Sequence, residues 1–202
     1  MTNTNPVLGI IGGGQLGSML ATAAKKIKIK TIILSDDPKA PAQNFCDETI
    51  ITSYNNLKKI DEFISKVDFV TFEFENIPLN VLEHISERKP VYPKPSINQI
   101  VQNRFTEKKF VNKQGIKTTS YILIKKKSDL LNVENLLPGF LKTCTLGYDG
   151  KGQYILNNKD EIDDLKIDFT KEYILEKKIN LKKEISIIIT RFLNNECLIY
   201  EP

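Results

Sequence analysis

A segment rich in lysine and glycine is the part of this sequence best suited to chemistry on phosphates. Lys142 ends an apolar run, and Lys151 lies in the following loop among glycines 147, 150 and 152. Glycine lets backbone N–H groups approach an anion closely, and each lysine adds a compact positive charge. The loop is not a Walker A loop, because Thr145 stands five residues before Gly150 and because Gly152, which has no hydroxyl, follows Lys151. The pattern predicts a nucleoside triphosphate held by a non-Walker glycine loop.

A second glycine segment, Gly12–Gly17, has the spacing G-x-G-x-x-G between a strand-like run and a helix-like run. Asp36 follows Gly17 by 19 residues, where a dinucleotide enzyme places the acid that binds ribose. The same geometry serves any phosphate, because a helix N-terminus favours an anion. The spacing leaves three interpretations open: a dinucleotide site, a site for a substrate phosphate, or a tight turn without a ligand.

Acidic side chains follow two of the predicted strands. Glu73 and Glu75 alternate with phenylalanines, so a strand would place both acids on one face at its carboxyl end, where substrates of parallel sheets bind. Glu176 and Glu184 lie eight residues apart and could bind the adenine amino group and the ribose hydroxyls of a nucleotide. Ordinary solvated acids are the alternative for both pairs. No residue of the chain is predicted to be a metal ligand.

Alternating strands and helices must position these residues. We predict strands over 7–11, 31–34, 48–52 and 69–74, with helices over 16–27 and 57–65 between them. This βαβ alternation is typical of a mostly parallel sheet. Two prolines in the segment 91–95 predict a connector.

The rest of the chain changes character. We predict helices over 97–114 and 128–137 and short strands over 121–124, 140–143, 153–156 and 172–176, with a final strand pair over 184–192 and 197–200. The predicted domains are residues 1–95, 96–175 and 176–202. The last of these ends with a strand pair that nothing covers, so we expect an interrupted domain.

The composition excludes several classes of protein. No apolar run of the 202 residues approaches the ~20 needed to span a bilayer, and the uncharged start does not resemble a signal peptide. Three dispersed cysteines fit a reducing cytoplasm rather than a disulfide framework. Residues 1–96 carry 11 basic and 11 acidic side chains, so the net charge of +4 lies in the second half, with the lysine-containing loop. We interpret lysines such as Lys125, Lys126 and Lys127, which stand next to ordinary turn residues, as solvated, and we expect no nucleic-acid partner.

Four segments together resemble one family, the N5-carboxyaminoimidazole ribonucleotide synthases, which are ATP-grasp ligases of purine biosynthesis. They are the glycine turn 11–17, the strand end 72–77, the Gln102–Arg104 tripeptide and the loop 142–153. The resemblance implies an α/β fold: a Rossmann-like pre-ATP-grasp domain followed by an incomplete ATP-grasp domain. It implies an enzyme that uses ATP, Mg²⁺ and bicarbonate to carboxylate aminoimidazole ribonucleotide, and that dimerises.

The resemblance also assigns roles to residues at matching positions. Tyr148, Asp149 and Lys151 become catalytic, where bicarbonate and the substrate amine meet. Gln15, Leu16 and Glu75 become contacts of the aminoimidazole ribonucleotide. The residues assigned to ATP are Arg104, Lys142, Gly147, Tyr148, Asp149, Gly150, Lys151, Gly152, Gln153, Glu176, Lys177, Lys178, Ile179 and Glu184.

Family members continue beyond the equivalent of Pro202 with a segment that carries their metal ligands. We therefore expect this chain to be an amino-terminal portion that is inactive alone, with magnesium bound by residues outside it. Two alternatives remain at this point: an NAD-dependent oxidoreductase built on the Gly12–Gly17 turn, and a nucleotide-binding module without catalysis.

Overall fold

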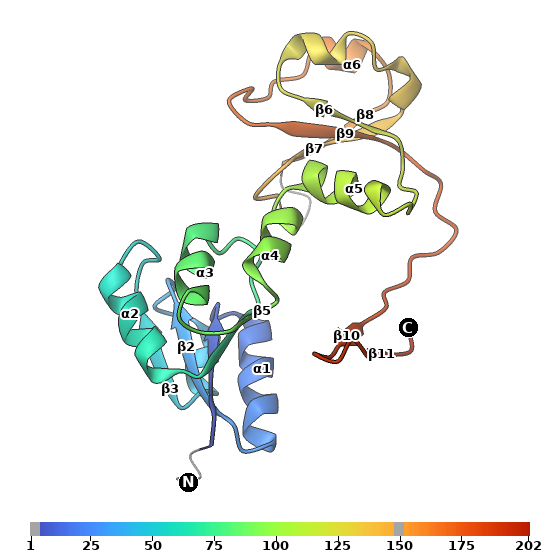
Figure 1. Ribbon diagram of the computed structural model, residues 1–202. Helices are drawn as coiled ribbons and strands as arrows, with labels where there is room; N and C mark the ends of the chain where they lie inside the picture. The colour runs from blue at the N-terminus through green and yellow to red at the C-terminus, as the bar shows by residue number, and fades with distance from the viewer. Residues whose placement is uncertain (1–4, 148–151) are drawn as a thin grey trace.

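A computed structural model describes residues 5–147 and 152–202. Figure 1 shows two layered units joined by a pair of helices, with a separate hairpin at the carboxyl end. None of the helices in the described ranges combines the length and the apolar character needed to cross a bilayer.

The first unit is a parallel five-stranded sheet in the order β3-β2-β1-β4-β5. Its strands are β1 (Val7–Ile11), β2 (Lys30–Ser35), β3 (Glu48–Ile51), β4 (Phe69–Phe72) and β5 (Val91–Tyr92). The prediction for 91–95 was therefore incomplete, because its first two residues form the edge strand β5. The chain leaves β1 toward β2 on one side and reaches β4 on the other, which makes the gap between β1 and β4 the switch point of the sheet.

Helices cover both faces of this sheet, so the strands carry buried apolar side chains on both faces. The helix α1 (Gln15–Lys26) and the 3-10 turn η1 (Pro41–Asn44) pack on the face that carries Ile10 and Ile33. On the opposite face, α2 (Leu57–Lys66) and α3 (Leu79–Ser86) pack on a core that includes Ile11 and Leu34. Side chains that alternate along a strand thus fill two separate cores.

Two short helices connect the units, where one long helix over 97–114 was predicted. α4 (Pro95–Val101) ends before Asn103, and α5 (Arg104–Lys113) starts after it. The Asn103 side chain accepts hydrogen bonds from the backbone N–H groups of Phe105 (3.0 Å) and Thr106 (3.1 Å), so it caps α5. A cap stabilises a helix start within the predicted helix, and this explains the break.

The second unit is an antiparallel sheet in the order β6-β9-β7-β8. Its strands are β6 (Tyr121–Ile124), β7 (Gly139–Thr143), β8 (Gln153–Leu156) and β9 (Tyr173–Lys177). The predicted helix 128–137 is two 3-10 turns, η2 (Lys127–Leu130) and η3 (Glu134–Leu136), which cover the sheet together with the short α6 (Asp160–Asp163). Asp129 explains part of the difference, because its carboxylate accepts the N–H groups of Lys125 and Lys126 and fixes a tight turn.

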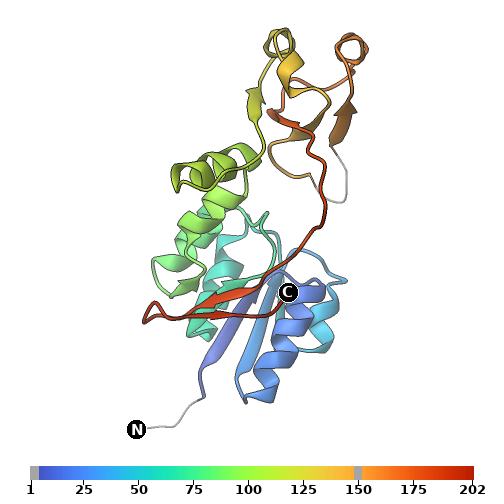
Figure 2. The same ribbon diagram turned by 90° about the vertical axis from the view of Figure 1, so that its right-hand side faces the viewer.

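After β9 the chain runs as an extended segment to the hairpin of β10 (Ile189–Arg191) and β11 (Cys197–Ile199). Figure 2 shows this hairpin in front of the first unit. Every residue from 178 to 202 is exposed, including apolar side chains such as Ile185 and Leu193. The described chain thus has two packed units and a third segment without a core of its own.

Candidate functional site

The first glycine segment forms the turn between β1 and α1 at the switch point of the parallel sheet. Gly12 has a φ of 103°, which favours glycine. Gly17 is buried in the first turn of α1, and a Cβ there would lie 2.7 Å from the backbone oxygen of Gly12. Both positions let α1 start directly against the end of β1. The N–H groups of its first turn therefore open onto the carboxyl edge of the sheet.

One acid of the chain itself occupies part of this turn. The backbone N–H of Gly14 donates to Oε1 of Glu73 at 3.0 Å. A Cβ on Gly12 would lie 2.7 Å from the same oxygen. Glu73 directly follows β4, so this contact links the end of β4 to the turn that follows β1. The Glu73 carboxylate therefore accepts the Gly14 N–H that an anionic ligand of the turn would otherwise use.

The strand that carries the acids ends earlier than predicted, and this changes their placement. β4 ends at Phe72 rather than at residue 74, so Glu73 and Glu75 do not share a strand face. Glu73 is half-buried against the glycine turn, whereas Glu75 is exposed. The backbone oxygen of Glu75 accepts a hydrogen bond from Gln102 Nε2 at 2.6 Å, which ties this loop to the end of α4.

Further polar groups lie at the same edge. The pKa of the Tyr54 phenol is raised, chiefly by burial and then by the nearby carboxylates of Asp36 and Glu73. Gln15 and Leu16, the predicted substrate contacts, are the first two residues of α1, and both are exposed. The sheet thus brings Gln15, Leu16 and Glu75 to one edge, as parallel strand ends do. Tyr54 was missed because no motif marks it.

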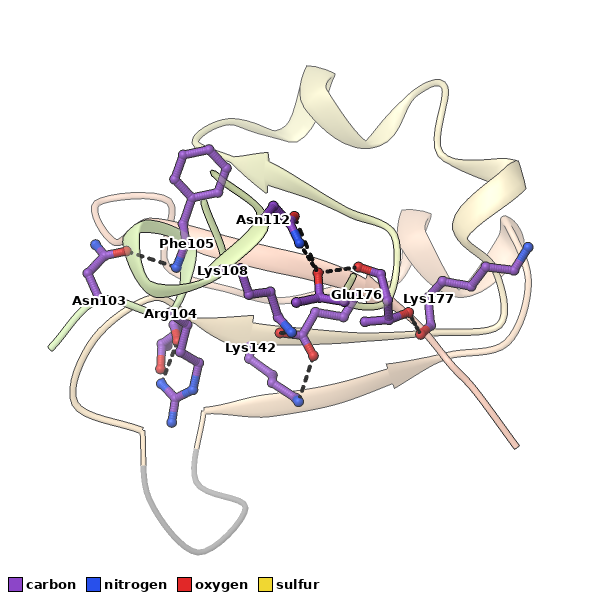
Figure 3. Close-up of polar contacts among 11 residues, drawn as sticks. Asn103, Arg104, Phe105, Lys108, Asn112, Lys142, Glu176 and Lys177 are labelled. Atoms are coloured by element: carbon purple, nitrogen blue, oxygen red, sulfur yellow. Dashed lines mark hydrogen bonds and ion pairs between the residues drawn. The ribbon is translucent and has the colours of Figure 1, made fainter. Parts of the chain in front are cut away.

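A second site lies on the antiparallel sheet, around a buried carboxylate (Figure 3). Glu176 on β9 is 7% exposed. Its Oε2 accepts a hydrogen bond from Lys142 Nζ of β7 at 2.9 Å, and its Oε1 lies 3.4 Å from Lys108 Nζ of α5. The Lys142 ammonium also lies 5.6 Å from the centre of the Phe140 ring. Two cations thus neutralise one buried acid, which leaves a net positive charge at this point.

These residues line a hollow of about 440 Å³, within the usual range for small-molecule sites. Its walls combine cations, the acids Glu176 and Glu184, and apolar side chains from Phe140, Ile179 and Leu181. Gln153 and Lys177, both predicted for ATP, also line it. Lys178 is not among the lining residues, and its backbone N–H donates to the Pro138 oxygen at 2.8 Å. A nucleotide could find partners here for the apolar face of its base, for the polar edge of that base and for its phosphate chain.

Arg104 supports the start of the loop that follows β7. One guanidinium nitrogen donates to the Thr143 oxygen at 2.8 Å, and the other donates to the Gly147 oxygen. The backbone N–H of Arg104 also donates to the Cys144 oxygen at 2.9 Å. Arg104 therefore fixes the backbone on which the glycine loop begins.

The far end of this loop returns at Gly152, whose oxygen accepts the Thr143 N–H at 2.9 Å. Gly152 has a φ of 72°, and a Cβ there would lie 2.9 Å from Thr143 Oγ1. The predicted catalytic residues Tyr148, Asp149 and Lys151 lie outside the described residues, as does Gly150.

Sequence reasoning missed five of the residues that line the second site, which are Lys108, Thr118, Thr119, Phe140 and Leu181. Lys108 stands four residues after Arg104 on α5, so both side chains lie on one helix face. That spacing was the available signal. In the ranges 5–147 and 152–202, no group of three or more His, Cys, Asp and Glu residues could hold a metal ion.

Family models match both halves of the chain. A ribonucleotide synthetase preATP-grasp domain matches residues 6–102, and an ATP-grasp domain matches residues 109–202. The chain is thus an α/β protein with a pre-ATP-grasp domain and part of an ATP-grasp domain. The predicted limits 1–95, 96–175 and 176–202 stay a prediction.

Proteins of known name resemble the chain over nearly its whole length. The N5-carboxyaminoimidazole ribonucleotide synthase of Staphylococcus aureus (strain COL) is 35% identical over 192 residues, covering 94% of this chain and 51% of that protein. The Bacillus subtilis synthase is 34% identical over 193 residues, with the same coverage of both chains. The chain therefore spans about half the length of these relatives.

Solved structures agree with the fold. The Staphylococcus aureus synthetase in complex with ADP has a TM-score of 0.88 and 33% identity, over 99% of this chain and 56% of that one. The Aspergillus clavatus synthase in complex with ADP and 5-aminoimidazole ribonucleotide has a TM-score of 0.84 and 26% identity, over 97% of this chain and 52% of that one. Nothing in these comparisons supports an NAD-dependent oxidoreductase.

Proposed function

Because this chain belongs to the N5-carboxyaminoimidazole ribonucleotide synthase family, we propose that it contributes to the ATP-dependent carboxylation of 5-aminoimidazole ribonucleotide with bicarbonate. The first unit binds the ribonucleotide, and the second binds ATP. The reaction belongs to purine biosynthesis in the cytoplasm, and the family suggests a homodimer. The observation that carries the proposal is the cationic cleft around Glu176, on a chain that resembles the synthases over 94% of its length.

In the proposed cleft, Lys142 and Lys108 meet the phosphates of ATP, and Arg104 holds the backbone of Thr143 and Gly147 beside them. The acid Glu184 takes the ribose, and the segment Glu176–Ile179 takes the adenine. We assign the segment 147–153 to the phosphates as well, and Tyr148, Asp149 and Lys151, which lie outside the described residues, to contacts with the reacting groups. Cations suit this role, because joining bicarbonate to a phosphate chain brings negative charges together.

In the proposed chemistry, a bicarbonate oxygen attacks the γ-phosphorus of ATP, and ADP leaves, which gives carboxyphosphate. The substrate amine then attacks the carboxyl carbon of carboxyphosphate and displaces inorganic phosphate, or it attacks the CO₂ that forms when carboxyphosphate loses phosphate. In either case the amine loses a proton as the C–N bond forms. Mg²⁺ is part of the proposal because phosphoryl transfer from ATP generally uses it to neutralise developing charge. Among the described residues we assign it no ligand.

In the first unit, the start of α1 at Gln15 and Leu16 binds the ribonucleotide phosphate, and Glu75 binds a polar group of the same molecule. A helix N-terminus suits a phosphate, because its first N–H groups have no intrahelical partner. The Glu73 carboxylate already accepts the Gly14 N–H, so we assign the ribonucleotide phosphate to the N–H groups of Gln15 and Leu16.

A chimaera tests this function. These 202 residues replace the matching half of the Staphylococcus aureus synthase, and phosphate release from ATP is measured in bicarbonate buffer with and without aminoimidazole ribonucleotide. We expect release that depends on the ribonucleotide. The 202-residue chain alone is the control, and we expect no release from it. A folded chimaera without ribonucleotide-dependent release contradicts the proposal.

A further inference from the structure

The Glu176 carboxylate is held by two lysines from different parts of the chain. Lys142 of β7 donates to its Oε2 at 2.9 Å, and the Lys108 ammonium of α5 lies 3.4 Å from its Oε1. Figure 3 shows both side chains directed toward this acid. Glu176 is buried and forms no other ion pair with the described residues. The two lysines, rather than water, therefore stabilise its negative charge.

Packing fixes Lys108 at this place independently of any ligand. Phe105, one turn earlier on α5, packs edge-on against the Tyr121 ring of β6, with the ring centres 5.8 Å apart. Tyr121 is the direct partner of Glu176 between β6 and β9. Residues three positions apart in a helix lie on one face, so the contact of Phe105 also places Lys108 beside Glu176.

The other charged side chains of the cleft do not supply this positive charge. Lys177 follows Glu176 on β9, and successive side chains of a strand point to opposite faces. Figure 3 accordingly shows the Lys177 side chain directed away from Glu176. Glu184 also lines the cleft and adds negative charge. The charged form of Glu176 thus depends on Lys108 and Lys142.

A bound nucleotide would separate the tasks of the two lysines. In the proposed site a phosphate takes the Lys142 ammonium, so Glu176 loses the partner that lies at 2.9 Å. Lys108 has three N–H donors, so it retains one for Glu176 even where another meets a phosphate. A buried carboxylate that is left without a cation takes up a proton, because burial disfavours its charge.

We propose that Lys108 is a positioning residue for adenine selection, because it keeps Glu176 ionised while Lys142 is bound to phosphate. The ionised carboxylate accepts an N–H of the adenine 6-amino group. A carbonyl oxygen at the same position of the base, as in inosine, has no proton to donate and faces a negative charge. The inference rests on the proposed function, which places adenine at Glu176 and a phosphate at Lys142.

The test compares ATP with ITP, in which a 6-oxo group replaces the 6-amino group, by titration calorimetry on the 202-residue chain at pH 7. The proteins are the unchanged chain, Lys108→Met, Lys108→Arg and Lys109→Met. Lys109 is the exposed neighbour of Lys108 and forms no ion pair in the described chain, so its substitution makes the same change outside the cleft. Each titration is run in PIPES and in Tris, whose different heats of ionisation report the protons taken up on binding.

We expect the unchanged chain to prefer ATP over ITP, and Lys108→Met to reduce this preference about fivefold to tenfold. That is the difference between a hydrogen bond to a charged acceptor and one to a neutral acceptor. ATP binding by Lys108→Met should also take up close to one proton more than binding by the unchanged chain. Lys108→Arg should restore both results, and Lys109→Met should alter neither. Lys108→Met should fold normally, because Lys142 still pairs with Glu176 in the absence of ATP.

Glu176→Gln separates this effect from a contact between Lys108 and phosphate. The amide carries no charge, so adding Lys108→Met to Glu176→Gln should change neither the preference for ATP nor the proton uptake. A phosphate contact of Lys108 would weaken ATP and ITP equally in this background. A further loss of the preference for ATP in the double variant would contradict a role that acts through Glu176.

Two other results overturn the inference and leave the proposed function standing. If Lys108→Met weakens ATP and ITP equally and takes up no additional proton, Lys108 meets phosphate only. If Lys108→Met behaves like Lys109→Met, Glu176 keeps its charge without Lys108. Absence of ATP binding to the unchanged chain contradicts the ATP site itself, and the inference with it.

Discussion

The two glycine segments of this chain differ in the charge that surrounds them. The turn Gly12–Gly17 meets the carboxylate of Glu73 and lies among other acids. At the second segment, Gly147 accepts a hydrogen bond from Arg104, and Gln153 lines a cleft with Lys142 and Lys108. Glycine spacing shows where a backbone can approach a ligand. We propose that side chains from distant elements then decide which ligand that is: the ribonucleotide at the first segment and the polyphosphate of ATP at the second.

The largest effect that we expect concerns the close packing of Gly17 against the turn that follows β1. Gly17→Ala should lower the free energy of unfolding by about 2–3 kcal/mol, because its Cβ would lie 2.7 Å from a backbone oxygen that cannot move aside. Urea unfolding followed by circular dichroism measures this. Gly115→Ala is the control, because its φ of 79° is strained for alanine but nothing lies within 4 Å. It should cost about 1 kcal/mol. Equal losses would contradict a closely packed turn.

The second prediction tests whether the cations of the cleft act locally. Lys142→Ala should weaken ATP binding about tenfold to a hundredfold, because it removes a charge-assisted contact with phosphate. Lys125→Ala should have little effect, since Lys125 is exposed and paired with Glu172 at 2.7 Å. Equilibrium dialysis with labelled ATP compares the two variants. Similar losses would mean that the basic residues act as a diffuse field.

Much of the fold follows from local sequence, and the contrast between its two units explains the rest. β1 and α2 lie close to their predicted limits because apolar runs and amphipathic periodicity are local signals. The break at Asn103 was readable in principle, because asparagine is a common helix cap. The segment 128–137 was not, since a pattern of helical spacing does not separate a helix from two 3-10 turns.

The candidate sites were predicted less fully, for a physical reason. Glu73 reaches Gly14 across 59 residues, and Glu176 reaches Lys142 across 34. Such contacts depend on strand order and helix placement, which no short motif encodes. The sequence therefore singled out Glu73, Glu176 and Lys142 one by one, but it did not predict the contacts Glu73–Gly14 and Glu176–Lys142.

The third prediction alters the charge at the first turn. Glu73→Ala should make inorganic pyrophosphate bind the first unit about tenfold more tightly, because it removes a negative charge and frees the Gly14 N–H. Glu73→Gln keeps an acceptor in place and should show a smaller gain. Calorimetric titration measures both variants. Tight pyrophosphate binding by the unchanged chain would contradict the account, and NAD binding that is lost in Asp36→Ala would favour an oxidoreductase.

The smallest effect concerns Cys144, which directly follows β7. Burial, together with the charge of Glu172, raises the pKa of its thiol to about 11. At pH 8, a disulfide reagent should therefore modify exposed Cys197 first and Cys144 last. The folded chain favours the protonated thiol, so this contribution to stability is lost as the pH rises from about 8.5 through the folded pKa. Cys144→Ala should show a weaker loss of stability over that range. Rapid labelling of Cys144 at pH 8 would contradict the burial of this thiol.

The most direct test of two separate ligand sites is an amide NMR titration of the ¹⁵N-labelled chain, first with ATP and then with aminoimidazole ribonucleotide. We predict that ATP shifts the amides of β7, Gln153 and Glu176, whereas the ribonucleotide shifts those of Gly14–Gly17 and Glu73–Glu75. Lys142→Ala should weaken only the first set of changes, and Glu75→Ala only the second. If both ligands shift the same amides, or if either variant abolishes both responses, the chain does not have two sites of opposite character.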